Sequence, residues 1–200
     1  MAQLLQINSS IFAENGKSTQ LADAYISELK KNNPDTKVKV RDFTASPIPH
    51  LDAARMGAFM TPAEERNDEQ KAVVAFSDEL INEIREADAI VLTLPMYNFG
   101  IPSNTKAYFD HIARAGVTFK YTETGPLGLL EDKPVYIIAT RGGQYQGTDL
   151  DTQTGYVKSF LNFIGLKNLE FIYAEGLNLG EESQKAALAN AHETLMGMAQ

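Results

Sequence analysis

The chain has 200 residues, 44% hydrophobic and 22% charged, values that suit one globular domain with a full core. Its formal net charge of −8 argues against nucleic acid as a partner, because phosphate binding relies on clustered Lys and Arg. The absence of cysteine excludes disulfides, thiolate catalysis and Cys-ligated metal centres. The 3 histidines lie far apart without ligand spacing, so no metal site is expected.

The hydropathy pattern indicates neither a targeting segment nor a membrane span. Residues 1–20 lack the basic start and long apolar run of a secretory signal. No apolar run approaches the ~20 residues that a membrane helix needs. We therefore expect a soluble cytoplasmic protein with no membrane partner.

In chain order, the first 43 residues predict a strand, a helix and a second strand. Residues 4–8 form a short apolar strand, and a loop at 9–17 follows it. Apolar residues at helical spacing then predict a helix that ends near Asn32-Asn33-Pro34. Residues 38–43 alternate between apolar and polar side chains, which indicates an edge strand with one face only partly covered.

The next stretch predicts a long loop and then a long helix. Residues 44–61 contain two prolines, one glycine and scattered apolar residues, and we expect an irregular segment that is functional or covers a partner surface. Thr61 is placed to cap a helix, with Pro62 at its first position and Glu64 at its third. This helix is predicted to run to about Ala87.

Three further pairs of strand and helix are predicted in the second half. The strands are short apolar or alternating runs: 89–93, 134–140 and 169–174. Ser103 or Asn104 is predicted to cap the first of the helices that follow them, and the other two are predicted to begin near Thr152 and near Glu181. Gly165 suits the residue that ends the second of these helices. Residues 117–130 are predicted as a turn-rich excursion.

Strand and helix thus alternate five times, which predicts the fold class. Strands one, three and four are apolar enough for the interior of a sheet, whereas strands two and five suit its edges. The pattern predicts a single flavodoxin-like domain over residues 1–200, a three-layer α/β/α sandwich with a five-stranded parallel sheet in the order 2-1-3-4-5. In that order, a ligand binds at the switch between strands one and three.

The loop after the first strand is a candidate phosphate site. It carries Ser10 and the segment Gly16-Lys17-Ser18, whose hydroxyls, helix-start amides and lysine can hold a phosphate without a metal. A serine-capped helix without a ligand is the alternative. The segment resembles the end of a P-loop, but Ile11 stands where the first glycine would be, and no Asp follows the third strand to help hold Mg²⁺. Nucleotide hydrolysis is therefore disfavoured.

Two more loops are predicted at the same rim of the sheet, because parallel strands end at one edge. The loop after the third strand displays Met96-Tyr97-Asn98-Phe99 between two prolines, which suits a planar aromatic ligand; aromatics that fill the core are the alternative. The loop after the fourth strand, Thr140-Arg141-Gly142-Gly143, offers backbone N–H groups, a cation and close backbone approach to a ring. Together the three loops predict a ligand with a phosphate and a broad ring system, FMN. Loss of Arg141 is expected to affect flavin retention more than folding.

Several separated segments carry a resemblance to one family. They are Pro95–Phe99, Ala113–Phe119, Tyr121–Glu123, Thr140–Gly143, Ala174–Gly176, Pro47–Pro49 and Phe163–Gly165. On these segments the whole chain resembles the FMN-dependent NADH azoreductase / NADH:quinone oxidoreductase family, whose members are flavodoxin-like homodimers. The chain departs from the family's usual serine at Gly16, and it has Gln144-Tyr145 where relatives often have a histidine.

The resemblance implies roles for the three loops and for two further residues. Ser10, Gly16, Lys17 and Ser18 would hold the FMN phosphate, and the loops after strands three and four would hold the ring. Asn98, Tyr121 and Phe163 would lie on the substrate side, the last two as walls over the open flavin face that a partner subunit can supply. Core packing is the alternative for Phe163.

The resemblance also implies the reaction. NADH or NADPH would reduce FMN, and a quinone or azo compound would then take two electrons from it, so no protein acid–base pair is expected as catalyst. A flavodoxin-type electron carrier without small-molecule turnover is the alternative, and the acidic charge suits it. The segments 44–61 and 117–130 argue against a carrier, because they suit a dimer interface and a substrate pocket.

Overall fold

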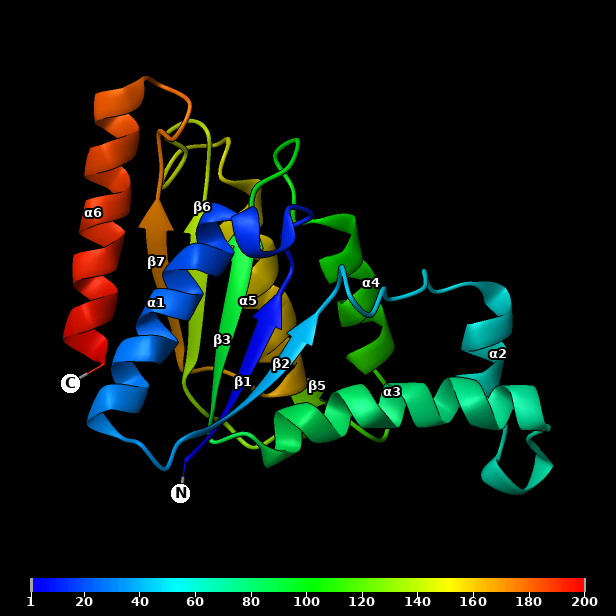
Figure 1. Ribbon diagram of the computed structural model, residues 1–200. Coiled ribbons are helices and arrows are strands. Elements are labelled where there is room, and N and C mark those ends of the chain that lie inside the picture. Colours follow the sequence, from blue (N-terminus) through cyan, green and yellow to red (C-terminus); the bar gives the residue numbers. More distant parts are fainter. Residues whose placement is uncertain (1, 200) are drawn as a thin grey trace.

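A five-stranded parallel sheet forms the centre of the protein, for which the computed structural model describes residues 2–199. Its strands are β1 (Gln3–Asn8), β2 (Lys37–Asp42), β3 (Ala89–Pro95), β6 (Val135–Thr140) and β7 (Leu169–Ala174). Every neighbouring pair is parallel, in the order β2-β1-β3-β6-β7 (Figure 1). The carboxyl ends of all five strands therefore meet at one edge of the sheet.

The predicted strand order needs a correction in its numbering. The expected order 2-1-3-4-5 left out a two-stranded antiparallel sheet of β4 (Phe119–Thr122) and β5 (Gly125–Gly128), which lies between β3 and β6 in the chain. The segment 117–130 was expected only as turns. It forms paired strands because Thr122 and Gly125 close a tight turn, with the Thr122 hydroxyl donating to the Gly125 carbonyl at 2.6 Å.

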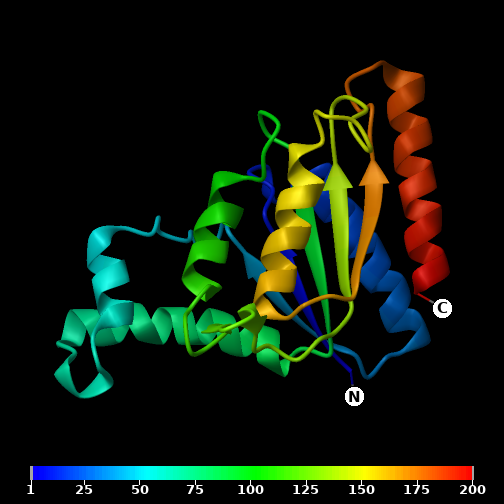
Figure 2. The same cartoon turned by 180° about the vertical axis from the view of Figure 1, so that it is seen from behind.

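Helices cover both faces of the sheet. On one face lie α1 (Lys17–Asn32) and α6 (Glu181–Met198), and on the other lie α3 (Asp68–Glu86), α4 (Ser103–Ile112) and α5 (Thr152–Ile164) (Figures 1 and 2). Successive strand residues point to opposite faces, so Leu4 packs with α1 and α6 while Leu5 packs with α3 and α4. This confirms the flavodoxin-like α/β arrangement.

The burial pattern of the strands follows their position in the sheet. In β3 all residues but the first are buried, and β6 is buried at all positions but one. No residue of β2 is fully buried, as expected for an edge. Within residues 2–199, no helix combines the length and apolar content that crossing a membrane requires.

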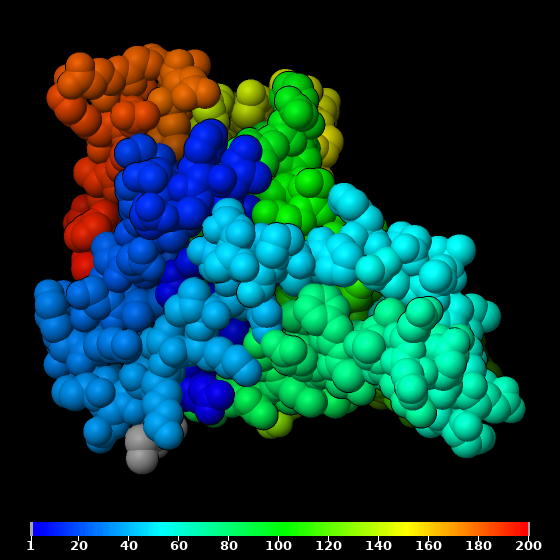
Figure 3. Space-filling view, turned by 45° about the vertical axis from the view of Figure 1, so that its right-hand side comes forward, coloured from blue at the N-terminus to red at the C-terminus, as the bar shows by residue number. Residues whose placement is uncertain are grey.

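The segment 44–61 is more regular than predicted, because it contains helix α2 (Ala53–Met60). Asp52 caps this helix by accepting a hydrogen bond from the Arg55 N–H at 2.8 Å. The helix packs against α3 and projects sideways from the sheet (Figures 1 and 3). Its Met60 side chain is 77% exposed.

The predicted start of the following helix at Thr61 and Pro62 is wrong. The Thr61 hydroxyl donates to the Gly57 carbonyl at 2.8 Å and so belongs to the end of α2, and only a short 3-10 helix, η2 (Ala63–Glu65), follows Pro62. The long helix α3 begins at Asp68 instead. Asn67 and Gln70 form a complete capping box there, which is a stronger start signal than Thr61 with its hydroxyl already used.

Two other helix ends test the sequence predictions. Gly165 ends α5 with φ 113°, which confirms its predicted left-handed conformation. The predicted caps of α4 are wrong, because Pro102 occupies the cap position and no side chain caps the helix. The Asn104 side chain instead donates to the Ser9 carbonyl at 3.2 Å, which ties α4 to the loop after β1.

Candidate functional site

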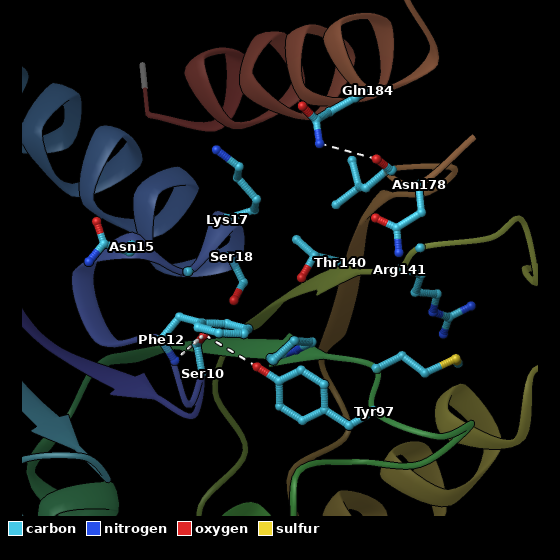
Figure 4. A pocket seen from close by; sticks show the side chains of 15 residues that line it. Ser10, Phe12, Asn15, Lys17, Ser18, Tyr97, Thr140, Arg141, Asn178 and Gln184 are labelled. Atoms are coloured by element: carbon cyan, nitrogen blue, oxygen red, sulfur yellow. Dashed lines mark hydrogen bonds between the residues drawn. The ribbon is translucent and has the colours of Figure 1, made fainter. Parts of the chain in front are cut away.

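A cleft of about 450 Å³ lies across the carboxyl ends of the central strands (Figure 4). The loops after β1, β3, β6 and β7 supply its walls. Its lining residues are Ser10, Phe12, Asn15, Gly16, Lys17, Ser18, Pro95, Met96, Tyr97, Thr140, Arg141, Gly142, Leu177, Asn178 and Gln184. The structure therefore brings together nine of the residues predicted to bind the cofactor, from all three predicted loops.

One end of the cleft is built to receive an anion. Helix α1 begins at Lys17 with no side-chain cap and no acidic residue in its first turn, so its first N–H groups and its positive dipole end are available. The Ser18 hydroxyl is fully buried and has no hydrogen-bond partner among the described residues. In Figure 4 it points into the cleft. A buried hydroxyl without a partner costs free energy that a bound phosphate oxygen would recover.

Tyr97 joins this anion site to the loop after β3. Its hydroxyl lies 3.4 Å from the Ser10 hydroxyl and accepts a hydrogen bond from the Ile11 N–H at 3.3 Å. The Ser10 hydroxyl in turn accepts the Phe12 N–H at 3.2 Å. The tyrosine ring thus lies along the wall of the cleft between the two loops (Figure 4).

The loop after β3 is a tight and strained turn. The N–H of Tyr97 donates to the Gly100 carbonyl at 3.1 Å, and the N–H of Gly100 donates back at 3.0 Å. Between them, Asn98 and Phe99 have φ values of 50° and 63°, in the left-handed region. Such a conformation costs on the order of 1–3 kcal/mol for a bulky residue and persists only where the surroundings hold it. Phe99 adopts this conformation although it is 48% exposed to solvent.

The loop after β6 leaves two backbone N–H groups without a backbone acceptor. The carbonyls of Arg141, Gly142 and Gly143 all accept hydrogen bonds from residues 176–178, at 2.8 to 3.1 Å. The N–H groups of Gly142 and Gly143 donate to no backbone carbonyl within residues 2–199. A Cβ on Gly142 would lie 2.5 Å from the Asn178 side-chain nitrogen, so a larger residue here would require the Asn178 side chain to move.

Arg141 does not direct its charge into the cleft. The side chain is fully buried, and its guanidinium donates to Asp151 at 2.9 Å, to Glu175 at 3.0 Å and to the Thr154 hydroxyl at 2.9 Å. It also stacks on the Tyr173 ring, 4.9 Å from the centroid. Because all these contacts lie within the fold, we expect loss of Arg141 to affect folding as well as the flavin retention predicted from the sequence.

The two carboxylates around Arg141 organise the rim of the cleft. Glu175 accepts the N–H groups of Tyr145 and Gln146, both at 3.0 Å, and so fixes the chain that follows the glycines. Asp151 caps α5 through the Thr154 N–H at 3.0 Å. Burial by itself would raise the pKa of Asp151, but hydrogen bonds from Arg141 and Thr154 outweigh it and hold that pKa below its usual value.

Three of the predicted residues in these loops lie beside the cleft and do not line it. Phe99 and Asn98 occupy the outer tip of the turn after β3. The Tyr145 ring covers Gly143, where a Cβ would lie 2.6 Å from a ring carbon, and it meets the Phe99 ring edge to face at 5.5 Å between centroids. Phe99 and Tyr145 thus form an aromatic rim next to the cleft.

A family model of the flavodoxin-like fold matches residues 2–197 of the chain. The chain belongs to this family. Its relatives include an FMN-dependent NADH:quinone oxidoreductase of Cellvibrio japonicus, which is 62% identical over 96% of both chains. A protein of the same description from Alcanivorax borkumensis is 54% identical over 96% of this chain and 98% of its own length.

Solved structures of this flavodoxin-like family agree with the fold. An azoreductase from Bacillus anthracis superposes with a TM-score of 0.90 at 28% identity and covers 100% of this chain and 99% of its own. An FMN-dependent NADH-azoreductase from the same species, solved in complex with FMN, gives a TM-score of 0.88 at 26% identity and covers 100% of both chains.

Two residues predicted on the substrate side lie far from the cleft in this flavodoxin-like chain. Tyr121 is on the β4–β5 hairpin, which packs against the carboxyl end of α5, at the opposite end of the sheet (Figures 1 and 2). Phe119 lies between Tyr121 and Phe163, at ring distances of 5.5 Å and 4.2 Å. Phe163 is partly buried, whereas Tyr121 is 76% exposed. The same chain therefore does not bring them to its own cleft.

Sequence reasoning missed the lining residues that follow β7. The topology supplied the signal, because a fifth parallel strand must end at the same rim as the other four. Leu177, Asn178 and Gln184 lie just beyond that strand and form one wall of the cleft. Phe12 and Asn15 were missed for another reason, since they lie inside the first loop between residues that were recognised.

Proposed function

We propose that the protein is an FMN-dependent NADH:quinone oxidoreductase that also reduces azo compounds. The observation that carries this proposal is the buried Ser18 hydroxyl, which has no partner among the described residues and faces a cleft at the start of α1. The relatives named for this activity support the enzyme over the electron carrier. The proposal treats residues 1–200 as one FMN-binding domain in the cytoplasm.

The residues of the cleft fit FMN at both of its ends. Ser10, Ser18 and the first N–H groups of α1 would hold the phosphate, with the Lys17 ammonium nearby. Lys17 makes only a long contact to Gln20, at 3.4 Å, so its charge is available to an anion. The Gly16 backbone lies against Ser10 and leaves no room for a side chain at this position.

The other end of the cleft would hold the ring system. Met96 and Tyr97 line it on one side, and Thr140 and Gly142 line it on the other. Backbone N–H groups aimed at a ring edge favour the negative charge that reduction places there. Bound FMN would accept a hydride from reduced nicotinamide and pass two electrons to a quinone or azo compound.

We also propose that the enzyme acts as a homodimer. Tyr121 is exposed on the hairpin together with Leu127 and Leu129, at 76%, 48% and 39%. Apolar side chains grouped in this way commonly mark an interface. A partner subunit that presents Tyr121 and Phe163 to the cleft would supply the wall that this chain lacks.

The test is direct. Apoprotein titrated with FMN should change the visible spectrum of the flavin and quench its fluorescence, and the complex should oxidise NADH or NADPH with menadione or methyl red as acceptor. Riboflavin is the matched ligand control, because it has the ring without the phosphate and should bind much more weakly. No spectral change with FMN, or no nicotinamide oxidation, contradicts the proposal. A stable one-electron semiquinone during reductive titration would favour the carrier.

A further inference from the structure

Gln153 lies behind the strained turn that forms one wall of the cleft. It belongs to the first turn of α5, and its side chain is 1% exposed. Its amide nitrogen donates to the Pro95 carbonyl at 3.0 Å and to the Gly100 carbonyl at 3.4 Å, which are the two ends of the turn. The preceding residue, Thr152, donates its hydroxyl to the carbonyl of Phe99.

The orientation of the Gln153 amide is fixed by its other neighbour. The Nε of Arg141 donates to the Gln153 oxygen at 3.3 Å. An arginine side chain only donates, so the oxygen of the amide must face it and the NH₂ group must face the carbonyls. The first residues of α5, Thr152 and Gln153, thus donate side-chain hydrogen bonds to the backbone carbonyls of this turn.

The same contacts connect the two sides of the cleft. Arg141 begins the glycine loop, and its charge is held by Asp151 and Glu175 in the interior. Gln153 links this arginine to the turn of Tyr97, and both loops are predicted to flank the flavin ring. Backbone pairing of β3 and β6 joins the two walls as far as Met96, whose N–H donates to the Thr140 carbonyl at 2.9 Å. Beyond that point the buried Gln153 amide supplies the side-chain link between the two loops.

We propose that Gln153, with Thr152, is a positioning residue for the flavin ring. Beyond the last β3–β6 backbone hydrogen bond, it holds the Tyr97–Gly100 turn in place relative to the glycine loop, and thereby sets the fit of the ring and the approach of the nicotinamide. This inference rests on the proposed function for its chemical consequence. The structural half, that Gln153 holds the turn, stands without any cofactor.

The structural half is tested in apoprotein by amide hydrogen exchange. In Gln153→Met the turn amides of Tyr97 and Gly100 should exchange about tenfold faster, as loss of one hydrogen bond predicts. Gln70→Met is the matched control, because Gln70 is also hydrogen-bonded, to Asn67 and Thr61, but lies at the start of α3. It should lower stability without affecting the turn. Unchanged exchange at Tyr97 and Gly100 in Gln153→Met would overturn the inference.

The chemical half is tested in the FMN-loaded protein. Gln153→Met should shift the visible flavin band and lower kcat for nicotinamide oxidation about tenfold, while KM for the quinone changes little. Thr152→Val, an exposed position, gives a second variant that should fold and shift the same band. Thr194→Val is its control, since this hydroxyl bonds only within α6. A lower melting temperature with an unchanged band and kcat would contradict the positioning role. Wild-type protein without FMN binding would instead contradict the proposed function, and the exchange result would still decide the role of Gln153.

Discussion

The backbone of Gly16 passes so close to Ser10 that a Cβ atom at position 16 would lie 2.2 Å from the Ser10 hydroxyl oxygen and 2.6 Å from its Cβ. The φ of Gly16 is −67°, so the glycine is needed for space and not for a left-handed conformation. The two residues form one packed unit at the anion site, and the missing side chain at position 16 lets the Ser10 hydroxyl occupy its place.

This packing predicts that Gly16→Ala weakens FMN binding. The added methyl group must displace Ser10, and overpacking of this kind should raise the dissociation constant of FMN about tenfold. Fluorescence quenching during titration of apoprotein with FMN measures the change. Gly57→Ala is the control, because nothing lies within 4 Å of a Cβ at that position. The double variant Gly16→Ala with Ser10→Gly should relieve the clash; equal FMN binding by Gly16→Ala and wild type would contradict the prediction.

Ser18→Ala should have opposite effects on the apoprotein and on the FMN complex. Removing a buried hydroxyl without a partner should stabilise the apoprotein by about 1 kcal/mol, while FMN affinity should fall about tenfold through loss of a phosphate contact. Urea unfolding and FMN titration measure the two effects. Thr19→Val removes a second buried hydroxyl of the same kind that does not line the cleft, so it should stabilise without weakening FMN. Parallel behaviour of the two variants would argue against a phosphate at Ser18.

Much of the fold could be predicted because its causes are local. The apolar runs at 89–93 and 134–140 predict buried strands. Gly165 follows an apolar helical pattern, where a glycine commonly ends the helix in the left-handed conformation. Competing start signals decided the rest. Thr61 and Pro62 are residue types that commonly start a helix. The chain nevertheless begins α3 at Asp68, because the side chains of Asn67 and Gln70 each accept a hydrogen bond from the other's backbone N–H.

For the site, the topology of the sheet predicted which loops come together but not how their side chains are oriented. Parallel strands place their loops together, which brought Ser10, Tyr97 and Gly142 to one cleft. The direction of a side chain within a loop depends on partners far along the chain. Arg141 turns inward because Glu175, thirty-four residues later, lies beside it, and no spacing rule reveals that pair.

Arg141→Met should therefore destabilise the fold severely. Without the guanidinium, the largely buried carboxylates of Asp151 and Glu175 lose their charged donor, which should cost up to about 3 kcal/mol of unfolding free energy. Urea unfolding of the apoprotein measures this loss. Arg55→Met is the matched control, because the Arg55–Asp52 pair is exposed to solvent and should contribute far less to stability. Similar losses in the two variants would contradict a structural role for Arg141.

The same network predicts acid sensitivity. The pKa of Asp151 is lowered in the folded state, so its contribution to stability is complete above its ordinary value of 3.8 and is lost as pH falls through the folded value. The unfolded chain takes up the proton first, which favours unfolding in acid. Melting temperatures measured downward from pH 7 should fall most steeply below about pH 4, and Asp151→Asn should flatten that part of the curve. Asp132→Asn would flatten it too, since hydrogen bonds from the Lys167 and Asn168 N–H groups lower that pKa.

The proposed homodimer predicts a separation between oligomeric state and FMN binding. Tyr121→Glu places a charge on the exposed hairpin, which should disfavour burial against a second copy of the chain and shift sedimentation toward the monomer. Binding of the FMN phosphate should persist, because Ser10 and Ser18 lie at the other end of the sheet. Turnover of menadione should fall, since the wall that the partner supplies is lost. Val40→Glu is the control, because Val40 is also exposed, at 54%, but lies on β2 away from the hairpin. A wild-type monomer with full quinone reductase activity would show that each chain works alone and that Tyr121 has no part in the site.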